Sequence, residues 1–119
     1  MHTALKGGVI EVYGDGSKTR DITFIDDVVE VSMLAMNYNK TDVFNIGGGN
    51  RISVKELAEK ILKITKSKSK LIFKEDVKGD VDHTEASNKK AKTQLNWTTK
   101  ISVDEGIRKY YEWVTRAGN

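Results

Sequence analysis

One stretch decides the fold of this 119-residue chain: Tyr13-Gly14-Asp15-Gly16-Ser17-Lys18-Thr19-Arg20-Asp21-Ile22-Thr23-Phe24-Ile25-Asp26-Asp27-Val28. Its first residue ends a predicted strand over residues 9–13, where β-branched and aromatic residues gather. Glycine, aspartate and serine then predict a turn over residues 14–17. A second strand is expected over residues 21–25, followed by a helix that Asp26 or Asp27 caps and that runs to about Tyr38.

Short strands and helices continue to alternate downstream of this stretch. Further strands are expected over residues 43–46, where three glycines follow, and over residues 71–73. The pair Ser53 and Glu56 forms a capping box and predicts a helix that begins at Val54. Ser102 and Glu105 form a second capping box and predict the start of the last helix. A short helix is expected over residues 87–95, and a helical turn over residues 1–6.

Three of these helices have apolar positions at helical spacing, which indicates the faces that they bury. The first has so wide an apolar surface that we expect it to be buried between other elements: Val28, Val29, Val31, Met33, Ala35 and Met36. The second has one stripe: Val54, Leu57, Ala58, Ile61, Leu62 and Thr65. The last has a comparable stripe: Val103, Ile107, Tyr110, Tyr111 and Val114.

Composition limits the class of protein. A chain of 119 residues with 38% hydrophobic and 31% charged residues fits one soluble domain. The sequence has no cysteine, which excludes disulfides and thiolate metal sites. No apolar run approaches the roughly 20 residues that cross a membrane, and the N-terminus lacks a secretory signal. We therefore expect an α/β or mixed α+β domain, built from short strands alternating with helices, in the cytoplasm.

Motifs for catalysis, metal binding or dinucleotide binding are not matched. The glycines at 14 and 16 do not precede a lysine and a helix as a phosphate loop requires. The glycines at 47–49 fail the Rossmann spacing because Ile52 stands where the last glycine belongs. His2 and His83 have no partner at metal-ligand spacing. We interpret Asp26 and Asp27 as helix caps and assign no catalytic and no metal-binding residue.

The ordered motifs do resemble one family. The segment 13–28 is followed by Val43-Phe44-Asn45-Ile46-Gly47-Gly48-Gly49, by Ile52-Ser53-Val54 and by Gly79-Asp80-Val81 with His83-Thr84. Leu95-Asn96-Trp97 and Glu105-Gly106-Ile107 with Trp113 come last. This order resembles the extended short-chain dehydrogenases that epimerise or dehydrate nucleotide sugars, with UDP-glucose 4-epimerase as the best-known type. The resemblance covers nearly the whole chain.

The resemblance implies that residues 1–119 are a single C-terminal, substrate-binding domain. In that family an N-terminal Rossmann domain binds NAD, and a Tyr-x-x-x-Lys pair performs the chemistry. No tyrosine of this chain has a lysine four residues later, and no glycine triplet has the Rossmann spacing. We therefore expect the Rossmann domain to lie outside this chain. The chain would bind no cofactor, would be inactive alone and would contribute nucleotide-sugar binding to an NAD-dependent epimerase or dehydratase.

The resemblance also implies a substrate site. Arg20 matches an arginine that contacts the diphosphate, for which a guanidinium offers paired donors. A salt bridge from Arg20 to Asp21 or Asp26 is the structural alternative. Tyr13 matches an aromatic residue beside the nucleotide base, and otherwise belongs to the core of its strand.

A second segment completes the implied site. Asp80 matches a residue near the ribose or near a preceding arginine. The family arginine is replaced here by Val77, and Lys78 offers a substitute positive charge without the paired geometry of a guanidinium.

Two other readings remain open. The chain can be a stand-alone nucleotide-sugar-binding module or the partner of a separately encoded Rossmann chain. The net charge of +3 and the lysines between residues 55 and 74 are also compatible with a small nucleic-acid-binding protein, although a solvated helix face explains those lysines more simply. We further expect an exposed apolar patch near the strands and the helix at residues 26–38, which favours self-association, and no membrane partner.

Overall fold

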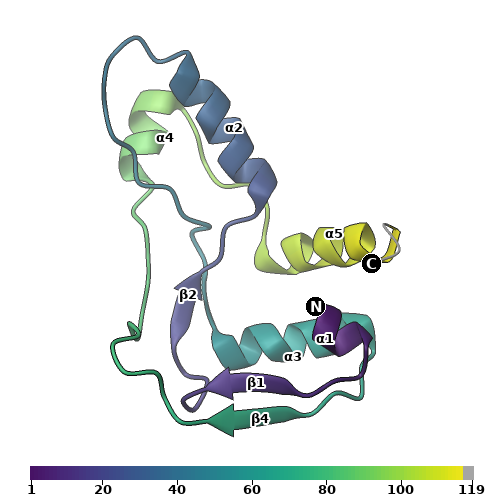
Figure 1. Cartoon of the computed structure of the whole chain (residues 1–119). Helices are drawn as coiled ribbons and strands as arrows, with labels where there is room; N and C mark the ends of the chain where they lie inside the picture. Colours follow the sequence, from purple (N-terminus) through teal and green to yellow (C-terminus); the bar gives the residue numbers. More distant parts are fainter. Residues whose placement is uncertain (117–119) are drawn as a thin grey trace.

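The computed structural model describes residues 1–116 and has a mixed α/β architecture (Figure 1). The order of elements is α1 (His2–Leu5), β1 (Ile10–Tyr13), β2 (Thr19–Asp21), α2 (Ile25–Met36), β3 (Arg51–Ser53), α3 (Val54–Thr65), β4 (Leu71–Lys74), α4 (Lys89–Leu95) and α5 (Val103–Arg116). The described chain is flat, with extents of 50 × 37 × 17 Å. Helices and short strands alternate as the sequence predicts.

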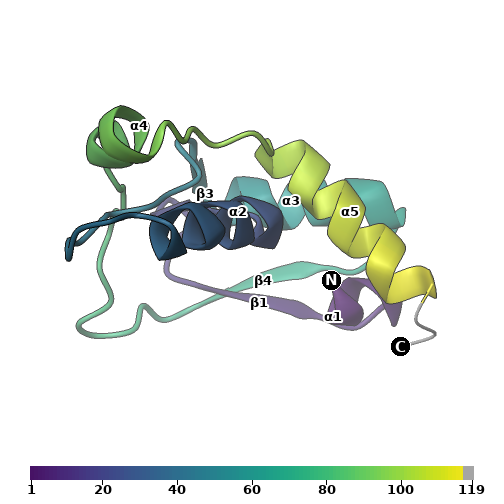
Figure 2. The ribbon, with the colours of Figure 1, turned by 90° about the horizontal axis from the view of Figure 1, so that it is seen from above.

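Two small sheets position the elements. Strand β1 pairs with β4 in parallel, with Tyr13 opposite Lys74, and β2 pairs with β3 in antiparallel, with Arg20 opposite Ile52. Helix α3 lies between the β1–β4 pair and α5, while α2 and α4 pack together at the other end of the molecule (Figures 1 and 2). Strand β2 therefore lies at the junction of the two halves.

The two serine caps are confirmed. The Ser53 hydroxyl accepts a hydrogen bond from the Glu56 amide at 3.1 Å, and α3 begins at Val54. The Ser102 hydroxyl accepts from the Glu105 amide at 3.2 Å, and α5 begins at Val103. Each cap satisfies a backbone N–H group that has no partner within the helix, which is why these starting points were predictable from local sequence.

The aspartate caps predicted for the first long helix are wrong. Helix α2 begins at Ile25 after Phe24, and no side chain caps it. The Asp27 side chain is instead buried and accepts hydrogen bonds from the Thr99 hydroxyl at 2.8 Å and from the backbone amides of Lys100 and Ile101 at 3.1 Å. Asp27 thus joins α2 to the chain that leads into α5.

Two strand predictions also need correction. Residues 43–46 form no strand, because no other strand of the described chain pairs with them and an extended segment needs such a partner. The second strand occupies residues 19–21 instead of 21–25, since its partner is the short β3, which the sequence did not predict. The glycines at 47 and 48 pack against this strand end: a Cβ atom at Gly48 would lie 1.8 Å from the Ile22 carbonyl oxygen.

The two faces of α2 differ in how far their apolar side chains are buried. Val31 packs in a cluster with Ala91, Leu95 and Trp97, which joins α2 to α4 and the segment after it. The opposite face of α2 is exposed within the described chain, and Met36 is 77% exposed. The expectation that other elements bury this face is therefore wrong for the described residues, whereas the expected exposed apolar patch on this helix is confirmed. Its exposed apolar residues, which we call the α2 patch, are Ile25, Val28, Val29, Met33 and Met36.

Candidate functional site

Strand β2 contacts the long connection between β4 and α4. Residues 75–88, between β4 and α4, contain no helix, and His83 within them forms a parallel bridge with Thr19 of β2. The Thr19 amide donates to the Asp82 carbonyl at 2.9 Å, and the Thr84 amide donates to the Thr19 carbonyl at 3.2 Å. The Thr19 hydroxyl lies 2.9 Å from His83 Nδ1. Residues more than 60 positions apart in sequence therefore face each other here.

Arg20 is held by this connection. Its Nη2 donates to Asp80 Oδ1 at 2.7 Å, and its Nη1 donates to the carbonyls of Thr19 at 2.9 Å and Asp82 at 3.4 Å. The alternative salt bridges to Asp21 and Asp26 are not formed. Asp21 accepts instead from the Ala86 amide, and Asp26 pairs with Lys109. The structure therefore brings together Arg20 and Asp80, two of the residues singled out in the sequence.

Lys18 is a further member of this site, which the sequence reasoning missed. Its side chain is only 9% exposed, and its Nζ lies 2.5 Å from Asp76 Oδ1 and 3.3 Å from Asp80 Oδ2. The hydrogen bond to Asp76 raises the pKa of the Lys18 ammonium. The hydrogen bond from Lys18, and then the charge of Arg20, lower the pKa of Asp80 below its ordinary value of 3.8. Lys18 and Asp80 are therefore both charged near neutral pH.

These four residues form one network, which we call the β2 cluster: Lys18, Arg20, Asp76 and Asp80. The Asp80 carboxylate bridges the two cations, one through each oxygen. Two positive and two negative charges give the cluster no formal net charge. Lys18 directly precedes β2 and lies two residues before Arg20. Residues two apart in an extended segment point to the same face, so this spacing was the available signal for Lys18.

Tyr13 and Lys78 lie at the edges of the β2 cluster. Tyr13 ends β1 and is 51% exposed, so its ring is not part of the strand core. The next residue, Gly14, lies close to Asp76. Lys78 lies in the exposed turn from Val77 to Asp80, and within the described chain it forms no salt bridge. Lys18, and not Lys78, is the cation beside Arg20.

The described residues do not form a dinucleotide-binding turn or a metal site. The glycines at 47–49 lack the Rossmann spacing, and a Cβ atom at Gly47 would lie 2.1 Å from the Asp21 carboxylate. These glycines therefore allow close packing against the end of β2. No group of acidic residues and histidines in residues 1–116 is arranged to hold a metal ion.

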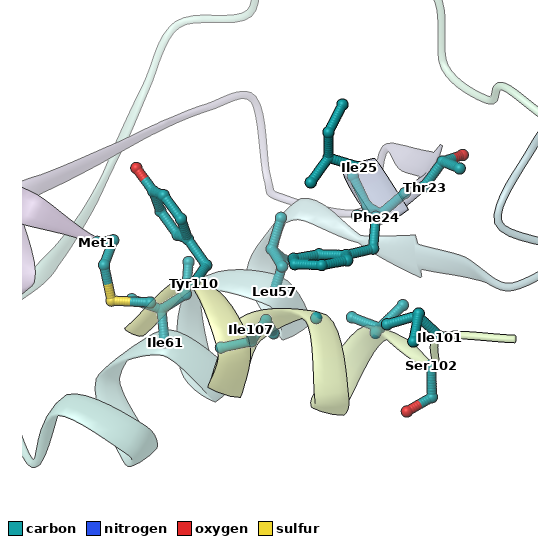
Figure 3. A pocket seen from close by; sticks show the side chains of 13 residues that line it. Met1, Thr23, Phe24, Ile25, Leu57, Ile61, Ile101, Ser102, Ile107 and Tyr110 are labelled. Carbon is teal, nitrogen blue, oxygen red and sulfur yellow. The ribbon is translucent and has the colours of Figure 1, made fainter. Parts of the chain in front are cut away.

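A separate apolar cavity of about 400 Å³ lies between the start of α2, α3 and α5 (Figure 3). Phe24, Leu57, Ile107 and Tyr110 are among its lining residues, and none of the lining side chains is charged. It shares no residue with the β2 cluster. Across residues 1–116 no helix combines the length and the apolar character that a membrane crossing requires.

Comparisons with known proteins agree with this architecture. Residues 2–110 match the family model described as GDP-mannose 4,6 dehydratase. UDP-glucuronate 4-epimerase of Thermodesulfobacterium geofontis is 34% identical over 105 residues, which cover 87% of this chain and 32% of that protein. A putative UDP-glucose 4-epimerase of Methanocaldococcus jannaschii is 32% identical over 103 residues, which cover 87% of this chain and 33% of that protein.

Solved structures of similar proteins share the fold. UDP-glucose 4-epimerase of Thermotoga maritima, solved with UDP-glucose, superposes with a TM-score of 0.93 at 33% identity. The superposed region covers 98% of this chain and 38% of the epimerase chain. UDP-glucuronic acid 4-epimerase of Bacillus cereus, solved with UDP-glucuronic acid and NAD, superposes with a TM-score of 0.88 at 28% identity. The superposed region covers 97% of this chain and 38% of that epimerase chain.

The shared fold and the ordered motifs define an epimerase or dehydratase of nucleotide sugars as the class of protein to which this chain is related. The chain belongs to the GDP-mannose 4,6 dehydratase family, within the NAD-dependent epimerases and dehydratases of the extended short-chain dehydrogenase type. It spans about a third of the length of the curated relatives that it matches.

Proposed function

We propose that this chain binds the nucleotide diphosphate of a sugar nucleotide for an epimerase or dehydratase, with the diphosphate at Arg20. The observation that carries this proposal is the placement of Arg20 on β2 with its guanidinium fixed beside the 75–88 connection. A fixed guanidinium recognises phosphate oxygens through planar, paired donors and keeps its charge at any physiological pH. Relatives of known structure carry UDP-glucose or UDP-glucuronic acid.

The remaining site residues have separate roles in this proposal. Tyr13 presents a half-exposed ring at the end of β1, which suits stacking against a nucleotide base. Asp80 lies within reach of the same region and can accept from a ribose hydroxyl once Arg20 releases it. Lys78 is available only as an exposed charge at the rim.

The chemistry itself is proposed to lie outside this chain. The sequence has no Tyr-x-x-x-Lys pair, and the glycines at 47–49 lack the Rossmann spacing. A Rossmann domain, in the same polypeptide or in a separate one, would bind NAD and supply the catalytic residues. The chain by itself would bind nucleotide and convert nothing.

Calorimetry with UDP and UDP-glucose tests the binding proposal. Wild type should bind both, and Arg20→Met should lose at least about ten-fold in affinity, because a charge-assisted contact to phosphate is lost. Arg108→Met is the matched control, since Arg108 lies on α5 and, among residues 1–116, forms a salt bridge with Glu112 alone. Equal affinities for the two variants would reject Arg20 as the diphosphate contact. Repeating the titration with a candidate Rossmann chain separates a stand-alone module from half of a two-chain enzyme.

A further inference from the structure

Arg20 is not freely available to a ligand in this structure, because Asp80 already occupies its Nη2 at 2.7 Å. A diphosphate that takes both donors of a guanidinium edge must compete with this carboxylate. Competition leaves the Asp80 carboxylate, which is 38% exposed, without its arginine and close to a second carboxylate, Asp76, at the same lysine. Like charges so placed repel each other, so a second cation that stays paired with Asp80 lowers the cost of the competition.

Lys18 has the geometry of that second cation. Its Nζ lies 3.3 Å from Asp80 Oδ2, the oxygen that Arg20 does not use, and Asp76 holds the same ammonium at 2.5 Å. The Lys18 side chain is nearly buried, so it is not itself positioned to meet the ligand. It acts on the ligand through Asp80.

The charge count leads to the same conclusion. With Lys18, the cluster presents two cations and two carboxylates. Without it, Asp76 and Asp80 outnumber the single cation Arg20, and the site repels an anion. Lys78 does not substitute for Lys18, since it lies in the exposed turn and is paired with neither carboxylate.

We propose that Lys18 is a positioning residue that holds Asp80 when a diphosphate displaces this carboxylate from Arg20. The proposal rests on the proposed function, because it needs a diphosphate that binds at Arg20. It adds a specific mechanism: Asp80 is an internal competitor for Arg20, and Lys18 makes its displacement possible.

Isothermal titration calorimetry with UDP and with inorganic pyrophosphate tests the mechanism, because pyrophosphate carries the diphosphate without the ribose. Lys18→Met should weaken both ligands about ten-fold. Lys60→Met is a matched control, since Lys60 also lies between two carboxylates, Glu56 and Asp104, but on α3. Asp80→Asn should strengthen pyrophosphate binding because the neutral amide no longer competes for Arg20. The loss caused by Lys18→Met should be much smaller in the Asp80→Asn background.

Each outcome of these titrations decides the proposal. A Lys18→Met effect no larger than that of Lys60→Met overturns it, and so does an equal loss in both backgrounds, which would indicate a merely structural role. If Lys18→Met does not fold by circular dichroism, Lys18→Arg and Asp80→Asn replace it. Lys18→Arg should keep most of the affinity, and Asp80→Asn without tighter pyrophosphate binding would refute the competition. Wild type that binds neither ligand defeats the proposed function as well, whereas binding with no response to Lys18 defeats only this inference.

Discussion

Replacing Asp27 by alanine should destabilise the fold more than any other single change at a charged residue of α2. The side chain is 1% exposed and satisfies the Thr99 hydroxyl and the backbone amides of Lys100 and Ile101. Its removal leaves two amides unpaired in a buried site, at about 1–3 kcal/mol each, and opens a small cavity. We therefore expect a loss of about 3–5 kcal/mol, a large part of the 5–15 kcal/mol that is typical of a domain.

Urea unfolding followed by tryptophan fluorescence measures this loss, because Trp97 is buried in the core cluster beside α2 and α4. Asp27→Asn keeps the volume and one acceptor and should lose about 1–2 kcal/mol. Asp26→Ala is the control at the neighbouring position, where the carboxylate is exposed and pairs with Lys109. The free energy of unfolding of Asp26→Ala should fall by no more than a surface ion pair contributes. An Asp27→Ala loss below about 1 kcal/mol would refute the assignment of Asp27 as the link between α2 and the chain before α5.

Three further predictions follow from the packing, the charges and the surface. In the same assay, Gly48→Ala should lower the free energy of unfolding by about 3 kcal/mol or more, because the new Cβ meets the Ile22 carbonyl. Gly7→Ala has open space around it and should lower this free energy by about 1 kcal/mol, from its positive φ alone. Similar losses in the two variants would refute the clash. The pKa of Asp80 is lower in the folded than in the unfolded chain, so its contribution to stability is present above pH 3.8 and disappears as the pH falls through the folded value. In Lys18→Met, NMR titration of the carboxyl group should show this pKa rising toward 3.8. An unchanged pKa would contradict the Lys18 contact. The α2 patch should promote self-association, which sedimentation velocity should detect at high concentration and which Met33→Lys with Met36→Lys should abolish; a strictly monomeric wild type would contradict it.

Local sequence was sufficient for some elements and not for others. The starts of α3 and α5 were predictable because Ser53 and Ser102 each bond to an amide three residues away. Residues 43–46 have the composition of a strand, but a strand also needs a neighbour, and sequence composition does not report whether that neighbour is present. The same limit explains why the short strand β3 was missed.

The site was predictable only in part, for the same physical reason. Arg20 and Asp80 were identified through the family motif, and the structure brings them together. Lys18 was missed because its partners, Asp76 and Asp80, lie 58 and 62 positions away and reach it only when the 75–88 connection docks on β2. Asp27 was misassigned because a carboxylate at a helix start fits a cap equally well, and only tertiary contacts distinguish the two roles.

The proposed nucleotide site on β2 is tested most directly by NMR. Backbone amide shifts of the wild-type chain, recorded during titration with UDP, identify the residues that the ligand approaches. We predict that the largest changes fall on residues 13–20 and 76–84, with a change at the Arg20 side-chain Nε. Changes that fall instead around the apolar cavity at Phe24, Ile107 and Tyr110, or no change at saturating UDP, would contradict a diphosphate site on strand β2.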